Sequence, residues 1–198
     1  MTKRTAKQTG AYSRRKGATF ERDVAAMVEH WSTIRTRRTP GSGSYGNDGA
    51  TDWNLAGDLM LDPGSRVPLH FELKRREGWT WPNTLANRGP VFKWFKQAND
   101  DAKSGQMPVL LFKKNRGSLW IGLPGTRKHW FHLRAGINPA IRLNADCIVY
   151  PFDKFVKHVP FKSFVRFASD HLKPVEYEFK TVNGQLCHLP KTGGDNGD

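Results

Sequence analysis

Residues 67–74 read V-P-L-H-F-E-L-K, with an apolar side chain at every second position. This period-two alternation is typical of a half-buried β-strand. Side chains two residues apart on a strand share a face, so we expect Glu72 and Lys74 to project together from one rigid element. Two interpretations of this face remain open: an ordinary surface ion pair, or part of a cation site that Asp58 completes.

The flanking segments predict the rest of a sheet and its covering helices. Upstream, we expect a helix over 18–31, a short basic strand over 33–39, a glycine-rich loop over 40–49, and a strand over 58–61 that turns at 62–65 into residues 67–74. Downstream, we expect a helix over 90–104, strands over 107–112 and 118–123, and, from a weaker pattern, a strand over 147–150 and a helix over 151–158. This order predicts a mixed central β-sheet flanked by helices, in the α/β or α+β class.

The composition points to a polyanionic partner. The chain has 198 residues, a net charge of +14 and a pI near 10.1. Nucleic acid is the first partner to consider for such a charge, and an anionic membrane surface is the second. We find no apolar run of the roughly 18 residues that a membrane span needs, and no signal peptide. We therefore expect a cytoplasmic protein without a membrane partner, in a prokaryotic or phage-infected host cell.

Charge and glycine content suggest a single domain with two tails. Residues 1–16 contain lysines and arginines but no acidic residue, which predicts a flexible basic arm that orders on phosphate, or a solvated tail that only aids solubility. We expect one domain over 17–180, with a C-terminal extension from about residue 124, and a polar, disordered tail over 181–198.

Several motifs together resemble the PD-(D/E)xK nuclease superfamily, and within it the archaeal and phage Holliday junction resolvases. The resemblance covers about residues 14–123. The matching motifs are R-R-K-G-A-T-F-E-R-D (14–23), P-G-S-G-S (40–44), G-D-L-M (57–60), F-E-L-K (71–74) and Gln97 in the following helix. Gly57 stands where the family usually has proline, the segment before Asp58 is longer than usual, and residues 124–198 match no part of the family.

The resemblance implies a restriction-endonuclease-like fold and a Mg²⁺-dependent endodeoxyribonuclease, with Mn²⁺ as a substitute ion. It implies that Asp58, Glu72 and the carbonyl of Leu73 bind the metal, and that Glu21 completes the acidic cluster directly or through water. Lys74 would orient the attacking water, favour its hydroxide form or stabilise the phosphorane. Gln97 would position water or substrate, or it is simply an exposed helix residue.

The resemblance also implies a branched DNA substrate, cut as a four-way junction by a symmetric homodimer. The DNA contacts would come from basic residues near the helix that bears Glu21, from a serine loop, and from the end of the Glu72 strand. The residues expected in these roles are Arg14, Arg15, Lys16, Arg22, Ser42, Ser44, Arg75 and Arg76. The serine loop is otherwise a flexible linker. Two other functions stay open: a restriction-like, repair or packaging endonuclease of the same superfamily, and a non-catalytic basic DNA-binding protein.

Overall fold

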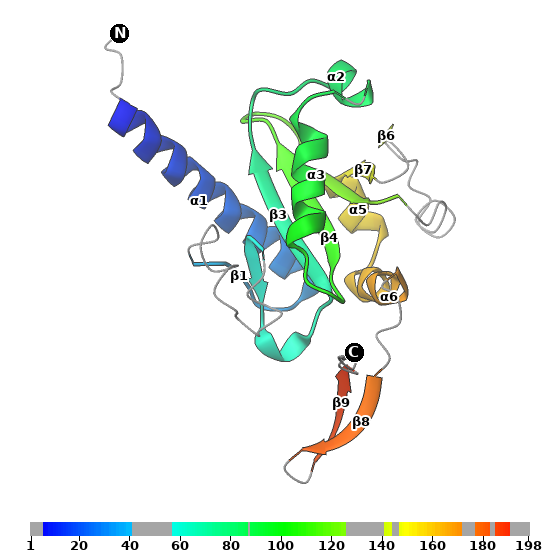
Figure 1. Cartoon of the computed structure of the whole chain (residues 1–198). Coiled ribbons are helices and arrows are strands. Elements are labelled where there is room, and N and C mark those ends of the chain that lie inside the picture. Colours follow the sequence, from blue (N-terminus) through cyan, green and yellow to red (C-terminus); the bar gives the residue numbers. More distant parts are fainter. Residues whose placement is uncertain are drawn as a thin grey trace, which may run out of the picture.

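The computed structural model describes residues 6–40, 57–86, 88–125, 141–143, 147–171, 177–182 and 185–190 (Figure 1). No helix within these ranges is long and apolar enough to cross a membrane. Ser42 and Ser44 lie outside the described residues.

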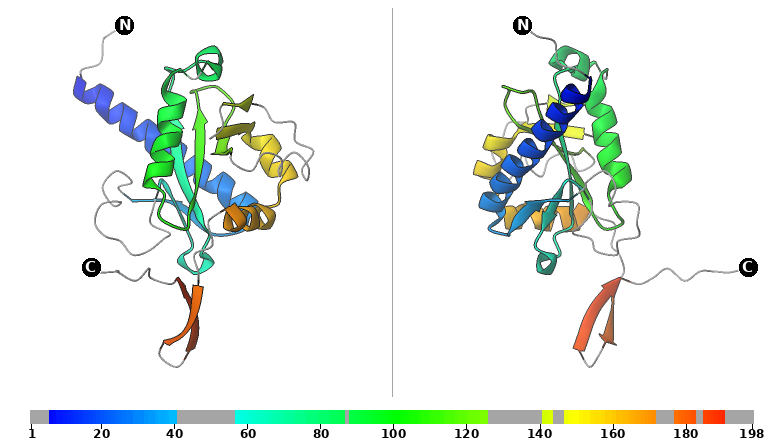
Figure 2. Two further views of the ribbon diagram at one scale, coloured as in Figure 1. Left: turned by 45° about the vertical axis from the view of Figure 1, so that its right-hand side comes forward. Right: turned by 90° about the vertical axis from the view of Figure 1, so that its left-hand side faces the viewer.

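The first element is a long helix, α1 (Ala6–Ser32). Its residues Phe20, Val24 and Val28 are buried and, at intervals of four, lie on one face of the helix. The helix expected over 18–31 is present, but residues 6–16 are helical rather than a flexible arm. Once the packed part of a helix has formed, further residues join it at little cost in free energy, because each added residue gains a hydrogen bond without a new nucleation step. The N-terminal half of α1 projects past the sheet (Figures 1 and 2).

Two short strands follow and pair with each other. β1 (Thr36–Arg38) and β2 (Leu59–Leu61) are antiparallel, with Arg38 opposite Leu59. The strand over 58–61 was expected to turn at 62–65 and lie next to residues 67–74. That pairing is wrong, because β2 pairs with β1 instead. After β2 the chain passes through the 3-10 helix η3 (Pro63–Ser65), and contact with the next strand is a single bridge between Gly57 and Phe71.

Within the part of the chain that the structure describes, the central sheet has five strands in the order β3-β4-β5-β7-β6. β3 (Leu69–Arg75) is an edge strand and runs parallel to β4 (Met107–Lys113). The remaining pairs are antiparallel and involve β5 (Trp120–Pro124), β7 (Cys147–Pro151) and β6 (Ile141–Arg142). The expected mixed sheet is confirmed, with one parallel pair among antiparallel ones.

Helices cover both faces of this sheet (Figure 2). On one face, Phe71 and Leu73 of β3 pack with the apolar side of α1 and with α5 (Phe152–His158) and α6 (Phe161–His171). On the other face, Leu110 and Phe112 of β4 pack under α3 (Pro90–Asp101), which follows the short helix α2 (Trp81–Leu85). As a result β3 is buried on both faces through residue 73, and not only on the apolar one.

The C-terminal third contributes to the same core. The strand and helix expected over 147–158 are confirmed as β7 and α5, and Phe155 and Phe164 share one hydrophobic cluster with β3. Beyond α6 a hairpin of β8 (Tyr177–Val182) and β9 (Gln185–Pro190) stands apart from the sheet (Figure 1). The described part of the segment expected to be a disordered tail thus includes a strand.

Candidate active site

Asp58 is fixed against the open edge of β3 by its own backbone and side chain. Its N–H donates to the carbonyl of Phe71 at 2.8 Å, and its Oδ2 accepts from the N–H of Leu73 at 2.8 Å. Gly57 makes this approach feasible: its φ is +94°, and a Cβ there would lie 2.6 Å from the Phe71 carbonyl oxygen. Only glycine tolerates both conditions, which explains why this chain lacks proline before Asp58.

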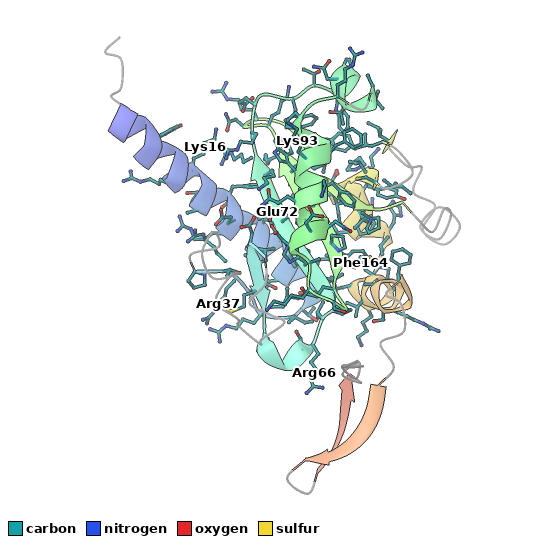
Figure 3. All side chains as sticks on the ribbon, viewed as in Figure 1. Lys16, Arg37, Arg66, Glu72, Lys93 and Phe164 are labelled. Atoms are coloured by element: carbon teal, nitrogen blue, oxygen red, sulfur yellow. The ribbon has the colours of Figure 1, made fainter. Side chains whose placement is uncertain are left out.

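Glu72 (labelled in Figure 3) lies on the face of β3 that α3 covers, near enough to Asp58 to feel its charge. It is 5% exposed, and its Oε1 accepts a hydrogen bond from Nζ of Lys74. Burial raises the pKa of Glu72 to about 7, and the negative charge of Asp58 acts in the same direction, while Lys74 opposes both. A buried carboxylate that a second carboxylate repels favours a neutralising proton or cation.

The donor atoms at this edge suit a hard divalent cation. Asp58 and Glu72 offer carboxylate oxygens, the ligands that Mg²⁺ prefers, and Mg²⁺ needs only one or two of them. The N–H and C=O of one residue in an extended strand point to the same side. The carbonyl of Leu73 is therefore directed toward Asp58, because the Leu73 N–H is bonded there. The residues present fit the ion that the resemblance implies.

Glu21 does not join this pair. Its Oε2 accepts from Nε of Arg38, which links α1 to β1. Arg38 is still close to the site, because the N–H of the next residue, Thr39, donates to the carbonyl of Asp58 at 3.0 Å. Within the described ranges, no three histidine, cysteine, aspartate or glutamate side chains converge as a metal-ligand group.

Gln97 lies on α3 and is exposed, and its Nε2 donates to Oδ2 of Asp101 at 3.3 Å. Asp101 was not anticipated from the sequence, yet its charge contributes to the pKa of Glu72. The i,i+4 spacing from Gln97 is the signal that would have placed both residues on one side of α3. Together they form the α3 border of the site.

His70 is a second residue that the sequence analysis gave no role. It precedes Glu72 by two residues on β3, is 1% exposed, and neither ring nitrogen has a hydrogen-bond partner within the described protein. Burial lowers the pKa of His70 to about 4, although the charge of Asp101 raises it slightly. A neutral imidazole therefore lies under the end of α3, next to Gly57.

The expected DNA-binding cations are distributed on two sides of the site. Residues 14–16 and Arg22 belong to α1 (Lys16 is labelled in Figure 3), and Arg15 and Arg22 are exposed. A cavity of about 620 Å³ between α1 and β1 is lined by Arg22 together with Arg37 and Arg38, which the sequence analysis did not single out. At the end of β3, Arg75 donates to the side chain of Asn115, and Arg76 is exposed.

The fold and this edge constellation define a nuclease of the PD-(D/E)xK superfamily with a restriction-endonuclease-like fold. Residues 12–166 match the family model described as "Phage putative PDDEXK endonuclease", and the chain belongs to that family.

The chain is also similar to Protein D14 of Escherichia phage T5. The two are 24% identical over 160 residues, which cover 78% of this chain and 98% of that protein. No solved structure shows a significant match. The family match begins within α1, includes the five-stranded sheet and ends within α6, so it extends well beyond residue 123, where the resemblance inferred from the motifs ends.

Proposed function

We propose that this nuclease is a Mg²⁺-dependent, structure-selective endodeoxyribonuclease that nicks four-way DNA junctions, with Mn²⁺ as a substitute ion. The observation that carries the proposal is the buried Glu72 carboxylate, which lies in the field of Asp58 and is hydrogen-bonded by Lys74. A DNA-binding protein without activity gains nothing from burying a carboxylate next to a second one, since their mutual repulsion costs stability.

In this proposal Asp58, Glu72 and the Leu73 carbonyl bind the ion, which when bound polarises the scissile phosphate and acidifies a water molecule. Lys74 donates to Glu72 in the DNA-free protein and would turn to the attacking water or to the phosphate oxygens once substrate arrives. Gln97 and Asp101 border the same site and would position water. Glu21 would act through water, or directly if phosphate draws Arg38 away from it.

The substrate is inferred from charge. Arg14, Arg15 and Lys16 on the projecting half of α1, together with Arg22, would contact one stretch of phosphates, and Arg75 and Arg76 would contact another. Ser42 and Ser44 would add hydroxyl contacts to phosphate. Resolution requires two cuts on strands of like polarity, which a homodimer with two-fold symmetry supplies. The reaction would take place in the cytoplasm of a prokaryotic or phage-infected cell.

Cleavage of matched DNA substrates tests this proposal. The full chain would be given four-way, flap, nicked and linear duplex DNA of shared sequence, each with Mg²⁺ and with EDTA. We expect paired, symmetric nicks on the four-way junction in Mg²⁺ and none in EDTA. Equal cleavage of linear duplex would overturn the junction assignment, and undiminished cleavage in EDTA would overturn the metal assignment.

A further inference from the structure

A row of three side chains crosses the sheet from the candidate active site. Lys74 on β3 is in register with Phe112 on β4, and Phe112 is in register with Trp120 on β5. Residues in register on neighbouring strands share a face. On this face of the sheet, Lys74 is therefore followed by one aromatic ring and then by a second one.

Three further tryptophans gather on this row. Trp79 and Trp81 pack against Phe112 at centroid distances of 5.2 and 6.4 Å, and Trp94 of α3 packs against it at 6.3 Å. Trp81 also meets Trp120 edge-on at 4.6 Å. We call Trp79, Trp81, Trp94, Phe112 and Trp120 the aromatic cluster.

The aromatic cluster has a buried floor and a partly open rim. Phe112 and Trp79 are 0% and 4% exposed, as expected for a small core under α3. Trp81, Trp94 and Trp120 are only partly buried. Packing accounts for the floor, whereas the rim leaves indole surface open on the sheet face that carries Lys74.

The segments around the aromatic cluster are strongly basic. Residues 75–94 and 113–120 contain seven lysines and arginines and one acidic residue, Glu77. Glu77 accepts a hydrogen bond from the N–H of Asn115, and Nζ of Lys114 lies 5.3 Å from the centre of the Trp79 ring. Lys93 lies on α3 near the end that faces α2 (Figure 3). An aromatic surface within such a charge field suits a nucleic acid better than an apolar protein surface.

We propose that the rim of the aromatic cluster, formed by Trp81, Trp94 and Trp120, binds unpaired nucleobases of single-stranded DNA adjacent to the scissile phosphate. The inference rests on the proposed function for the position of that phosphate, next to Lys74. Bases stack on indole faces without regard to sequence, and flanking cations bind the backbone between them. The cluster would thus favour DNA whose strands are already separated at the cleavage point over continuous duplex.

Binding without cleavage tests this inference. The full chain in EDTA would be titrated into a labelled oligo-dT strand and into a blunt duplex of equal length. Trp81→Ala and Trp120→Ala should each weaken single-strand binding by about 5- to 150-fold, the range for losing one stacked base, and change duplex binding less than twofold. Trp81→Phe should keep most of the affinity, and Met27→Ala, a change at an exposed apolar residue of α1, should keep all of it.

A second measurement requires no substitution and so does not depend on the folding of a variant. Oligo-dT should quench the tryptophan fluorescence of the wild-type chain and bind more tightly than an oligomer of the same length made of abasic sites. Equal affinity for the two oligomers, or equal losses on single strand and duplex in the variants, would overturn the inference. A change of oligomeric mass in Trp81→Ala with unchanged single-strand binding would overturn it in favour of a protein interface. None of these readouts depends on cleavage. The stacking proposal can therefore be refuted while the nuclease proposal stands, and the nuclease proposal can be refuted while the stacking proposal stands.

Discussion

At the scale of single residues, the site is governed by the environment of Glu72. Its carboxyl is removed from water, repelled by Asp58 and hydrogen-bonded by Lys74. The first two effects outweigh the third, and the result is a group that titrates near neutral pH rather than near 4.5. Such a site binds a cation most readily above pH 7, where Glu72 has released its proton.

The metal-free protein should show this titration as a pH-dependent stability difference. Folding raises the pKa of Glu72 from 4.5 to about 7, so its stabilising contribution is complete below about pH 4.5 and is lost as the pH rises through 7. His70 acts in the opposite direction: folding lowers its pKa from 6.5 to about 4, and its contribution is lost as the pH falls through that range. The two largely cancel in the wild-type chain, so a variant is needed to separate them.

Glu72→Gln removes only the first contribution. The free energy of unfolding of Glu72→Gln minus that of the wild type should rise by on the order of 3 kcal/mol between pH 4.5 and pH 7.5. Urea denaturation in EDTA at several pH values measures this difference. A difference that stays constant with pH would show that Glu72 titrates normally.

Gly57 offers a test of how Asp58 is positioned. Gly57→Ala places a Cβ 2.6 Å from the Phe71 carbonyl oxygen at a φ of +94°, and we expect it to lower the free energy of unfolding by about 2 kcal/mol or more. Gly78→Ala is the matched control, because a Cβ there has no neighbour within 4 Å, and it should change stability by less than about 0.5 kcal/mol. Equal effects in thermal denaturation would contradict this account of the Gly57–Phe71 bridge.

At the scale of elements, local patterns predicted β3, β4 and β7 and the packed half of α1. These segments could be recognised from the sequence because their buried side chains recur with the period of the element, as Phe20, Val24 and Val28 do in α1. The N-terminal half of α1 was missed because its sequence is polar and basic and shows no apolar helix period. The partner of β2 was missed because pairing between strands distant in the sequence is decided by tertiary packing. Asp101 was missed for the same reason: nothing local shows that the end of α3 lies near β3.

Arg15, an exposed residue of α1, allows the proposed DNA contact to be measured. Arg15→Ala should weaken DNA binding and reduce the slope of log affinity against log salt by about 1, because one phosphate contact and its released counterion are lost. Lys154→Ala, at an exposed position on α5, is the control and should leave the slope unchanged. Salt titrations by fluorescence anisotropy give both slopes, and identical slopes for the two variants would place the DNA elsewhere.

At the scale of the whole molecule, residues 147–171 are part of the nuclease fold. β7 pairs with β5, and Phe164 of α6 is fully buried in the cluster that supports Phe71 and Leu73. Phe164→Ala should therefore cost about 3–5 kcal/mol of stability, whereas Leu85→Ala, at an exposed residue of α2, should cost less than about 0.5 kcal/mol. Chemical denaturation gives the free energy of unfolding of both variants. A small effect at Phe164 would mean that the C-terminal helices contribute little to the stability of the domain.

The geometry of the candidate site depends partly on local sequence pattern and partly on packing between elements that are distant in the sequence. Strand period alone placed Glu72 and Lys74 on one face, because a strand fixes that geometry whatever surrounds it. The raised pKa of Glu72, the pairing of Glu21 with Arg38 and the approach of Asp101 depend on how α1, β1 and α3 pack around β3. The same packing builds the aromatic cluster from residues on four elements and a loop.

The central claim is that Asp58 and Glu72 hold a catalytic cation beside Lys74. Cleavage of a four-way junction by the wild type, Glu72→Gln and Asp100→Asn across a Mg²⁺ titration tests it most directly, since Asp100 is an exposed carboxylate paired with Lys96 on α3. The prediction is a loss of at least about a thousandfold in cleavage rate for Glu72→Gln, with junction binding retained and Asp100→Asn unaffected. Cleavage by Glu72→Gln at the wild-type rate would contradict the claim.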